Sequence, residues 1–570
     1  LLGLFSSYGE IGQKNYTPWR ATAFEFFLQD NWKATQKLTL EYGVRYNYWP
    51  PWYSLWNNVA TFRLEFYQPG LLGINPTNGA VVINSGNFAL ARYNGISLPG
   101  SSFPEEARGR VAAADDASLN DLFRGIPRGL SETHKNVFEP RLGLAYAFNN
   151  KTVVRTGFGI FHQRVPLNGS TLYGGNAPLQ FLVGVENGSV EAPAGVISSF
   201  DDSIRFPFNL TMQDPEFKHP TAYNWSLTVQ RQLPGAITVE LGYVGKRSLF
   251  LTRERNINQL QLGQAFTRNA AGAPTGTVRF ANALRPYLGH GPIRLSENAG
   301  NSHYHSGQLS VNRRFANGIS FDVAYTFSKS IDNASVFREL LPNAYDDRNF
   351  RGPSNFDRPH VFVVNGNLEL PFGTGRRLLN DGVLSTVFGG FQVTAITFVR
   401  SGTPFSLSLP ANVDLLGVGG GSSAQSLSAR GPLRQIAPRF GGTFVDDPSL
   451  ITVPAPGTEG NLGRNRFRNP RFQNHDIALF RNFRITESSR IQFRAELFNW
   501  INHPVLNGPV ANPVANGLTT NLTSTGYGQF APLTDQNRAS GFTVPTRDFG
   551  VYNTKGDQRR TIQFALKFLF

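Results

Sequence analysis

The chain contains no cysteine and a single methionine among its 570 residues. Without cysteine it has neither a disulfide framework nor a thiolate metal site. Charged residues are also scarce, at 16%, against about a quarter in soluble globular proteins. The longest uncharged run that merits testing as a membrane helix, 383–399, falls short of the roughly 20 apolar residues that such a helix needs. These shortages count against an ordinary soluble protein and against a helical membrane protein.

Aromatic residues, glycine and proline are abundant instead. Aromatics make up 13% of the chain, with 58 glycines and 36 prolines. Hydrophobic residues reach 40%, yet the mean hydropathy is slightly negative, at -0.25. A transmembrane β-barrel has this balance because its strands alternate apolar and polar side chains.

The net charge of +15 could indicate a nucleic-acid partner. The Lys and Arg residues are scattered singly, however, apart from loop clusters such as Arg464, Arg466 and Arg468. We therefore expect no nucleic-acid partner. Anionic lipid headgroups or anionic ligands are the expected partners, through the attraction of opposite charges.

Strict alternation of apolar and polar residues is the main structural signal. In 223–230, aromatic and aliphatic residues occupy the odd positions and polar residues the even ones. Successive side chains point to opposite faces of a strand, so each such segment has one apolar and one polar face. Most of these segments have about the length that crosses a bilayer when tilted. The thirteen segments run over roughly 21–32, 37–49, 141–149, 152–162, 222–232, 236–245, 304–314, 319–328, 360–370, 390–400, 475–483, 489–500 and 560–570.

Short and long connections alternate along the chain. Tight turns such as 149–151 and 233–235 carry Asn, Pro or Gly, whereas connections such as 50–140 are long. Short periplasmic turns and long extracellular loops are typical of outer-membrane barrels. With the long loops outside, an odd number of further strands must precede the thirteen, which gives the even total of bacterial single-chain barrels. Because the chain starts at Leu1, we expect a fragment that lacks its N-terminal part.

Several stretches resemble the C-terminal barrel of TonB-dependent receptors, in particular the large Oar-like group. The resemblance spans nearly the whole chain and is carried by the motifs FFLQDNW (26–32), LTLEYGVRY (38–46), PRLGLAY (140–146), VRTGFGIF (154–161), AYTFSKS (324–330), FDRPHVF (356–362) and RAELFN (494–499). It implies an all-β fold, a partial antiparallel transmembrane barrel with about 13 of 22 strands. Residues 1–570 would form a single domain, from which the plug, the TonB box and an N-terminal regulatory-like domain are absent.

The resemblance also implies a location in the bacterial outer membrane and energy coupling through the TonB complex. The implied partners further include membrane lipid, lipopolysaccharide and the barrel assembly machinery. In such barrels the last strand is an insertion signal that usually ends on Phe, so Phe570 is a candidate assembly signal. A girdle aromatic at the membrane interface is the simpler interpretation of this residue.

Two tryptophans are candidate ligand contacts. Trp52 and Trp56 follow the outer end of segment 37–49, beyond two prolines. The neighbouring tyrosines fit an aromatic girdle, whereas the tryptophans are better placed to stack on a sugar or peptide. The further candidate contacts lie in the long loop 401–474 and are Arg464, Arg466 and Arg468.

The sequence offers no sign of an enzyme, a cofactor or a metal centre. It has no HExxH motif and no convincing GxSxG elbow. His303 and His305 share a strand face, but no further ligand lies near them in the sequence. We therefore expect a receptor-transporter whose loops capture an unidentified ligand. The alternatives are a passive porin or a surface adhesion barrel without TonB coupling, and a soluble propeller, for which no repeat is visible.

Overall fold

The structure is a computed structural model that describes residues 4–11, 16–75, 81–84, 88–180, 182–189, 208–270, 272, 274–277, 281–379, 381–409, 414–420, 423–509, 556 and 559–570. Part of the last predicted loop, 501–559, therefore lies outside the described residues. Among the described helices, none combines the length and the apolar character needed to cross a membrane.

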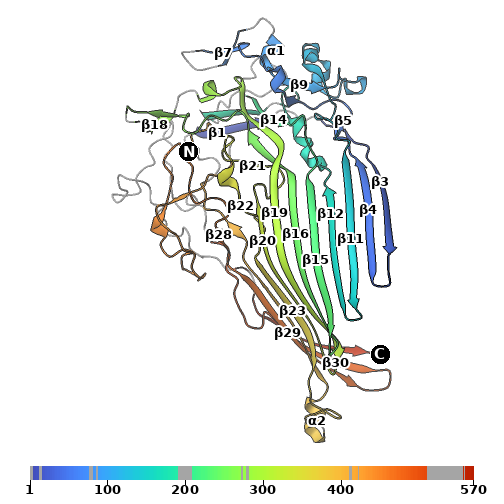
Figure 1. The fold of residues 1–570 in the computed structure, drawn as a ribbon. Helices are drawn as coiled ribbons and strands as arrows, with labels where there is room; N and C mark the ends of the chain where they lie inside the picture. Colours follow the sequence, from blue (N-terminus) through green and yellow to red (C-terminus); the bar gives the residue numbers. More distant parts are fainter. Residues whose placement is uncertain are drawn as a thin grey trace.

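A single curved sheet forms the body of the molecule (Figure 1). Thirteen of its strands follow one another in chain order, each antiparallel to the next, so the predicted meander is confirmed. We call these strands the wall. They are β3 Phe24–Lys33, β4 Leu38–Tyr48, β11 Val137–Asn149, β12 Thr152–His162, β15 Thr221–Leu233, β16 Ile237–Asn256, β19 His290–Ala316, β20 Ile319–Asp332, β23 His360–Glu369, β24 Phe391–Arg400, β29 Phe472–Arg484, β30 Arg490–Phe498 and β31 Thr561–Leu569. In the described pairing β3 and β31 form the two edges, so the sheet is open.

The wall has one apolar and one polar face. Residues opposite each other in the ladders share a face, so Leu227 lies beside Thr156 and Tyr243, while Thr228 lies beside Arg155 and Gly242. A hollow of about 920 Å³ lies against the polar face between β3 and β19. Alternation predicts a lipid-facing set in 223–229 and 562–568, and the ladders place all of its members on the other, apolar face. They are Tyr223, Trp225, Leu227, Val229, Ile562, Phe564, Leu566 and Phe568.

Two wall strands are much longer than the alternation predicts. The segments 236–245 and 304–314 are the inner parts of β16 and β19, which are 20 and 27 residues long. Both continue as a paired ladder to Asn256 and Arg294, with register shifts between Ser248 and Arg253. The prediction of a loop over 246–303 was therefore wrong at both ends. Much of each extension is buried or half-buried irrespective of the face, so these residues need not alternate apolar and polar side chains.

The long connections fold into a packed layer at one end of the wall, which we call the outer cap (Figure 1). Its larger core joins residues from two loops and the β19 extension, including Phe62, Leu98, Leu122, Phe208 and Ile293. A second core lies within the loop between β24 and β29 and includes Leu407, Phe444 and Phe467.

Three short strands of the cap belong to the main sheet. β14 Phe208–Gln213 runs parallel to β19, β21 Glu339–Leu340 runs parallel to β16, and β22 Gly352–Pro353 is antiparallel to β20. The remaining short strands of the cap are β1 Leu4–Ile11, β2 Trp19–Arg20, β5 Tyr53–Ser54, β6 Thr61–Phe62, β7 Leu72–Ile74, β8 Val81–Ile83, β9 Ile96–Pro99, β10 Phe123–Ile126, β13 Leu182–Ser189, β17 Phe266–Arg268, β18 Pro274–Thr277, β25 Pro404–Phe405, β26 Ser428–Ala429, β27 Ile451–Thr452 and β28 Phe467–Arg468.

The cap also holds helical turns. Its α-helix is α1 Phe88–Arg92, and its 3₁₀ turns are η1 Leu64–Phe66, η2 Glu105–Ala107, η3 Ala112–Asp115, η4 Ala117–Leu122, η5 Leu167–Gly169, η6 Thr171–Gly175, η7 Ala281–Leu284, η8 Arg348–Phe350 and η9 Pro448–Leu450. The opposite end of the wall carries the short turns, which mark the periplasmic side. The connection 370–390 is the exception there, and it contains α2 Gly382–Phe388.

Candidate ligand site in the outer cap

A cavity of about 500 Å³ lies in the cap where the β20–β23 loop meets the β24–β29 loop. Its lining combines apolar residues with polar ones and with charges of both signs, and the polar and charged ones include Arg338, Glu339, Asn349, Ser423, Gln425 and Arg464. The side-chain oxygen Oε1 of Gln425 accepts a hydrogen bond from the backbone N–H of Leu416 at 3.0 Å, which fixes the orientation of the Gln425 side chain. The Gln425 amide nitrogen and the Ser423 hydroxyl are buried without a protein partner in the described part of the chain. These two groups can therefore hydrogen-bond a ligand in the cavity.

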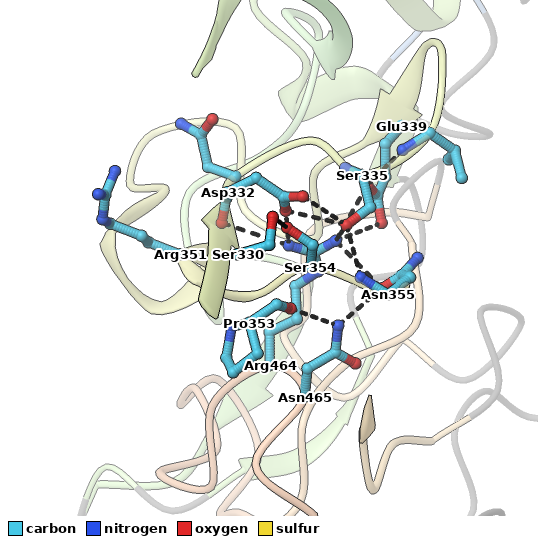
Figure 2. Close-up of polar contacts among 12 residues, drawn as sticks. Ser330, Asp332, Ser335, Glu339, Arg351, Pro353, Ser354, Asn355, Arg464 and Asn465 are labelled. Atoms are coloured by element: carbon cyan, nitrogen blue, oxygen red, sulfur yellow. Dashed lines mark hydrogen bonds and ion pairs between the residues drawn. The ribbon is translucent and has the colours of Figure 1, made fainter. Parts of the chain in front are cut away.

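Arg464 lies between the β20–β23 loop and the β24–β29 loop, among polar residues of the first loop (Figure 2). Its Nη1 lies 2.6 Å from Asp332 Oδ1, and its Nη2 lies 3.2 Å from Glu339 Oε2. The same Nη2 donates to Ser335 Oγ at 2.7 Å and to Asn355 Oδ1 at 3.2 Å. The arginine side chain is only 5% exposed, so this charge is buried but fully compensated, as a buried ion pair requires.

The backbone of Arg464 and the neighbouring Asn465 also contact the β20–β23 loop. Asn465 has a left-handed backbone, with φ of 57°, which Asn tolerates better than most residues. Its amide donates to Pro353 O and Asn355 Oδ1, each at 2.7 Å (Figure 2). A Cβ atom at Gly352 would lie 2.5 Å from the Arg464 carbonyl oxygen, so only glycine allows this approach.

The other two arginines of the predicted cluster differ in their surroundings. Arg468 pairs with the buried carboxylate of Asp357 and donates to the Gly402 carbonyl. Arg466 is exposed. The structure therefore places Arg464 in the lining of the cavity. It also gives both Arg464 and Arg468 partners within the protein, and these contacts hold the loops together. Contact of the three arginines with a ligand stays a prediction.

Further ion pairs connect the extensions of β16 and β19 to the loop between β20 and β23. Arg253 lies 3.0 Å from Glu297 and also pairs with Asp347. Arg338 pairs with Glu254, and both side chains are buried. The outer ends of the long strands are thus bound to the loop that forms one side of the cavity.

The two predicted tryptophans lie in another part of the cap. The Trp52 indole donates to the Val165 carbonyl at 3.1 Å, and the Arg164 guanidinium lies 4.5 Å from its ring centroid. Trp56 packs against the larger cap core, with Arg110 at 5.6 Å from its ring. Each of the two indole rings thus already has an arginine near it. Stacking of a ligand on these rings stays a prediction.

The remaining sequence candidates are also described. Phe570 is 95% exposed beyond the end of β31, and its ring centroid lies 5.9 Å from that of Phe568. Its role in assembly stays a prediction. His305 Nδ1 contacts the Tyr243 hydroxyl at 2.7 Å. Within the described residues no three His, Asp or Glu side chains gather as a metal site would require.

Sequence reasoning missed Gln425, Ser423, Asp332 and Glu339. Polar residues in a long loop and at a strand end resemble ordinary solvated positions. Their role depends on contacts across more than 100 residues, as between Arg464 and Asp332, and no local pattern indicates such contacts.

The family of the chain follows from a comparison with family models. Residues 1–563 match the model described as an outer membrane beta barrel domain. The chain belongs to this family and is a protein of the bacterial outer membrane. No curated protein matches it.

Solved structures similar to the chain include three receptors or transporters. The ferric-catecholate import receptor Fiu from Escherichia coli shares 9% identity at a TM-score of 0.38, over 97% of this chain and 45% of the receptor. The siderophore receptor PiuA from Acinetobacter baumannii shares 8% at 0.37, over 96% and 43%. The outer membrane transporter YddB from Escherichia coli shares 10% at 0.39, over 96% and 54%. The chain thus spans about half the length of these proteins or less.

Proposed function

We propose that this chain is the wall and outer cap of an outer-membrane receptor-transporter that captures a small polar ligand and passes it inward. The cap cavity is the observation that carries the proposal. It lies between two outer loops, and it presents the unpartnered amide nitrogen of Gln425 and hydroxyl of Ser423. Pockets with a few fixed polar groups are typical of small-molecule sites. Energy coupling through TonB is part of the proposal and is supported by the sequence motifs that resemble TonB-dependent receptors.

The polar face of the wall fits the second half of this function. The hollow beside it is lined by residues such as Gln29, Glu41, Arg141 and Lys246, so a hydrated ligand would meet hydrogen-bonding groups there. In this proposal residues 1–570 form one partial barrel domain, and the ligand enters from the cap.

The proposal is tested by measuring first the capture of a small molecule by the protein and then the uptake of that molecule by cells. The full-length protein is incubated with extracts of spent growth medium, and retained small molecules are identified by mass spectrometry. Retention should be lost in Gln425→Leu and kept in Arg439→Ala, an exposed residue of the same loop that does not line the cavity. Equal retention by both variants would show that the cavity is not the ligand site.

Uptake of the retained molecule is then measured in cells with and without TonB. Uptake that stops without TonB supports the receptor-transporter. Uptake that continues identifies a passive porin, and retention without any uptake identifies a surface binding barrel.

A further inference from the structure

The connection between β23 and β24 is the longest of the described turns at the periplasmic end of the wall. We call its described residues, 370–379 and 381–390, the α2 hairpin. The wall ends where the hairpin begins, because the Glu369 amide donates to the carbonyl of Gly318 in the neighbouring turn at 2.7 Å. Figure 1 shows α2 beyond the ends of the strands. The α2 hairpin therefore starts where the wall strands end.

The α2 hairpin has one polar contact that involves a buried residue, and its large apolar side chains are exposed. The hydroxyls of Thr374 and Ser385 lie 3.0 Å apart, and Ser385 is buried. Val383 is 78% exposed, and about half of each neighbouring large apolar side chain is exposed, at Leu384, Val387 and Phe388. A contiguous apolar patch of this kind marks an interaction surface.

Arg481 shows on which side of the wall the patch lies. This residue belongs to the apolar face of β29, and its ring partner Phe483 shares that face, with the guanidinium 4.3 Å from the ring centroid. Its Nη1 donates to Val387 O at 2.7 Å and its Nη2 to Thr386 O at 2.6 Å. A cation at the end of a helix also compensates the helix dipole. Because Arg481 reaches the C-terminal end of α2 from the apolar face, this end of the helix lies on the lipid-facing side of the wall.

A second contact fixes the other arm of the hairpin. Arg376 lies 2.6 Å from Glu369, whose other oxygen accepts from Gln392. These contacts lie on the polar face, so the α2 hairpin is held from both faces of the wall. Arg377 is exposed in the same hairpin.

We propose that the α2 hairpin is an interfacial anchor that binds phospholipid of the inner leaflet of the outer membrane. Val383, Leu384, Val387 and Phe388 enter the acyl-chain boundary, and Arg377 binds lipid phosphate, since basic side chains beside an apolar face extend to the headgroup region. Arg481 holds the C-terminal end of α2, which carries Val387 and Phe388, on the lipid-facing side of the wall. A periplasmic protein would need this end of the patch to stand clear of that side.

This chain contains no cysteine, so an introduced cysteine is its single thiol for labelling. The full-length variant Val383→Cys is labelled with an environment-sensitive fluorophore and reconstituted into phosphatidylcholine vesicles. Its fluorescence should be quenched by lipids that carry a doxyl group near the headgroup and shielded from aqueous iodide. Glu487→Cys, at the exposed tip of a neighbouring turn, is the control and should show the reverse. A Val383 label that iodide quenches as strongly as the control, or that neither agent reaches, overturns the proposal.

The phosphate contact is tested in the same labelled protein. Phosphatidylglycerol in the vesicles should increase lipid quenching of the Val383 label severalfold over phosphatidylcholine alone. Arg377→Glu should abolish this increase while leaving the phosphatidylcholine value unchanged. An equal response of both proteins to phosphatidylglycerol would show that Arg377 does not bind lipid phosphate.

Discussion

Arg464 and Asp332 form a buried ion pair, with 2.6 Å between Nη1 and Oδ1, although they are 132 positions apart in the sequence. Asp332 is the last residue of β20, and Arg464 belongs to the loop between β24 and β29. The pair therefore connects the outer end of a wall strand to the loop that covers the cavity. The guanidinium also donates hydrogen bonds to Ser335 Oγ and Asn355 Oδ1.

Removal of the Arg464 guanidinium should open this junction. Arg464→Ala leaves the carboxylates of Asp332 and Glu339 without their cation, and breaking one side of a buried pair costs about 3–5 kcal/mol. Hydrogen exchange of residues 333–359 and 423–471 in the full-length protein should become faster. Arg466→Ala, at an exposed position two residues away, should change local stability by less than about 0.5 kcal/mol. Similar exchange in both variants would show that the ion pair does not hold the loops.

The two faces of the wall should respond differently to a charge. Leu227→Arg places a cation on the apolar face and should cost about 2–4 kcal/mol near the membrane midplane. Thr228→Arg points to the polar face, beside Arg155, and should be much milder. Refolding of the full-length protein into lipid vesicles measures both, and equal losses would contradict the assignment of the faces.

The packing of Trp225 against a glycine on the next strand should also be measurable. An ideal Cβ at Gly245 would lie 2.2 Å from the Trp225 indole, so Gly245→Ala forces the ring out of place. Overpacking of this kind costs about 1–3 kcal/mol. Gly307 lies on the same face with nothing within 4 Å of its ideal Cβ, so Gly307→Ala should be neutral. Denaturant unfolding in detergent compares the two, and a neutral Gly245→Ala would argue against this packing.

The outer cap should lose stability in acid. His290, at the cap end of β19, contacts Phe62, and burial lowers its pKa to about 4 from the ordinary 6.5. Between these values the unfolded cap binds a proton that the folded cap does not, so stability falls as the pH falls from about 6.5 towards 4. Burial also lowers the pKa of His219 to about 4, which adds to the same trend.

Hydrogen exchange of the cap core at pH 7 and pH 5 checks this dependence. Wild-type protein should exchange faster at pH 5 after correction for the intrinsic rate. His290→Gln removes one titrating group, so its stability should depend less steeply on pH. An unchanged dependence in this variant would mean that His290 is not responsible.

The wall could be predicted from the sequence because its forces are local and periodic. The bilayer on one face and water on the other impose alternation, and segments such as 222–232 show it. The extensions of β16 and β19 were missed because they are packed within the cap, where that constraint ends. The first half of the run 383–399 is a helix rather than a strand, and its second half is β24, as expected.

The site was predictable only in part. The cluster around Arg464 stands out in the sequence as a group of charges in a long loop. Its partners Asp332 and Glu339 belong to another loop, and the cap core forms from residues as distant as Phe62 and Ile293. Such contacts depend on how the loops pack in three dimensions, and single-sequence patterns carry no signal for them.

The chain-order pairing of the wall has a consequence for how such proteins can diversify. Each outer loop leaves one strand and returns on its neighbour, so one loop can be exchanged for another without shifting the register of any wall strand. Loops that contribute β14, β21 and β22 are the exception, because they are hydrogen-bonded to the extensions of β19, β16 and β20. Evolution of a new specificity at the cavity would therefore replace the loop between β20 and β23 together with the strand ends that β21 and β22 pair with, while leaving the membrane-spanning part unchanged.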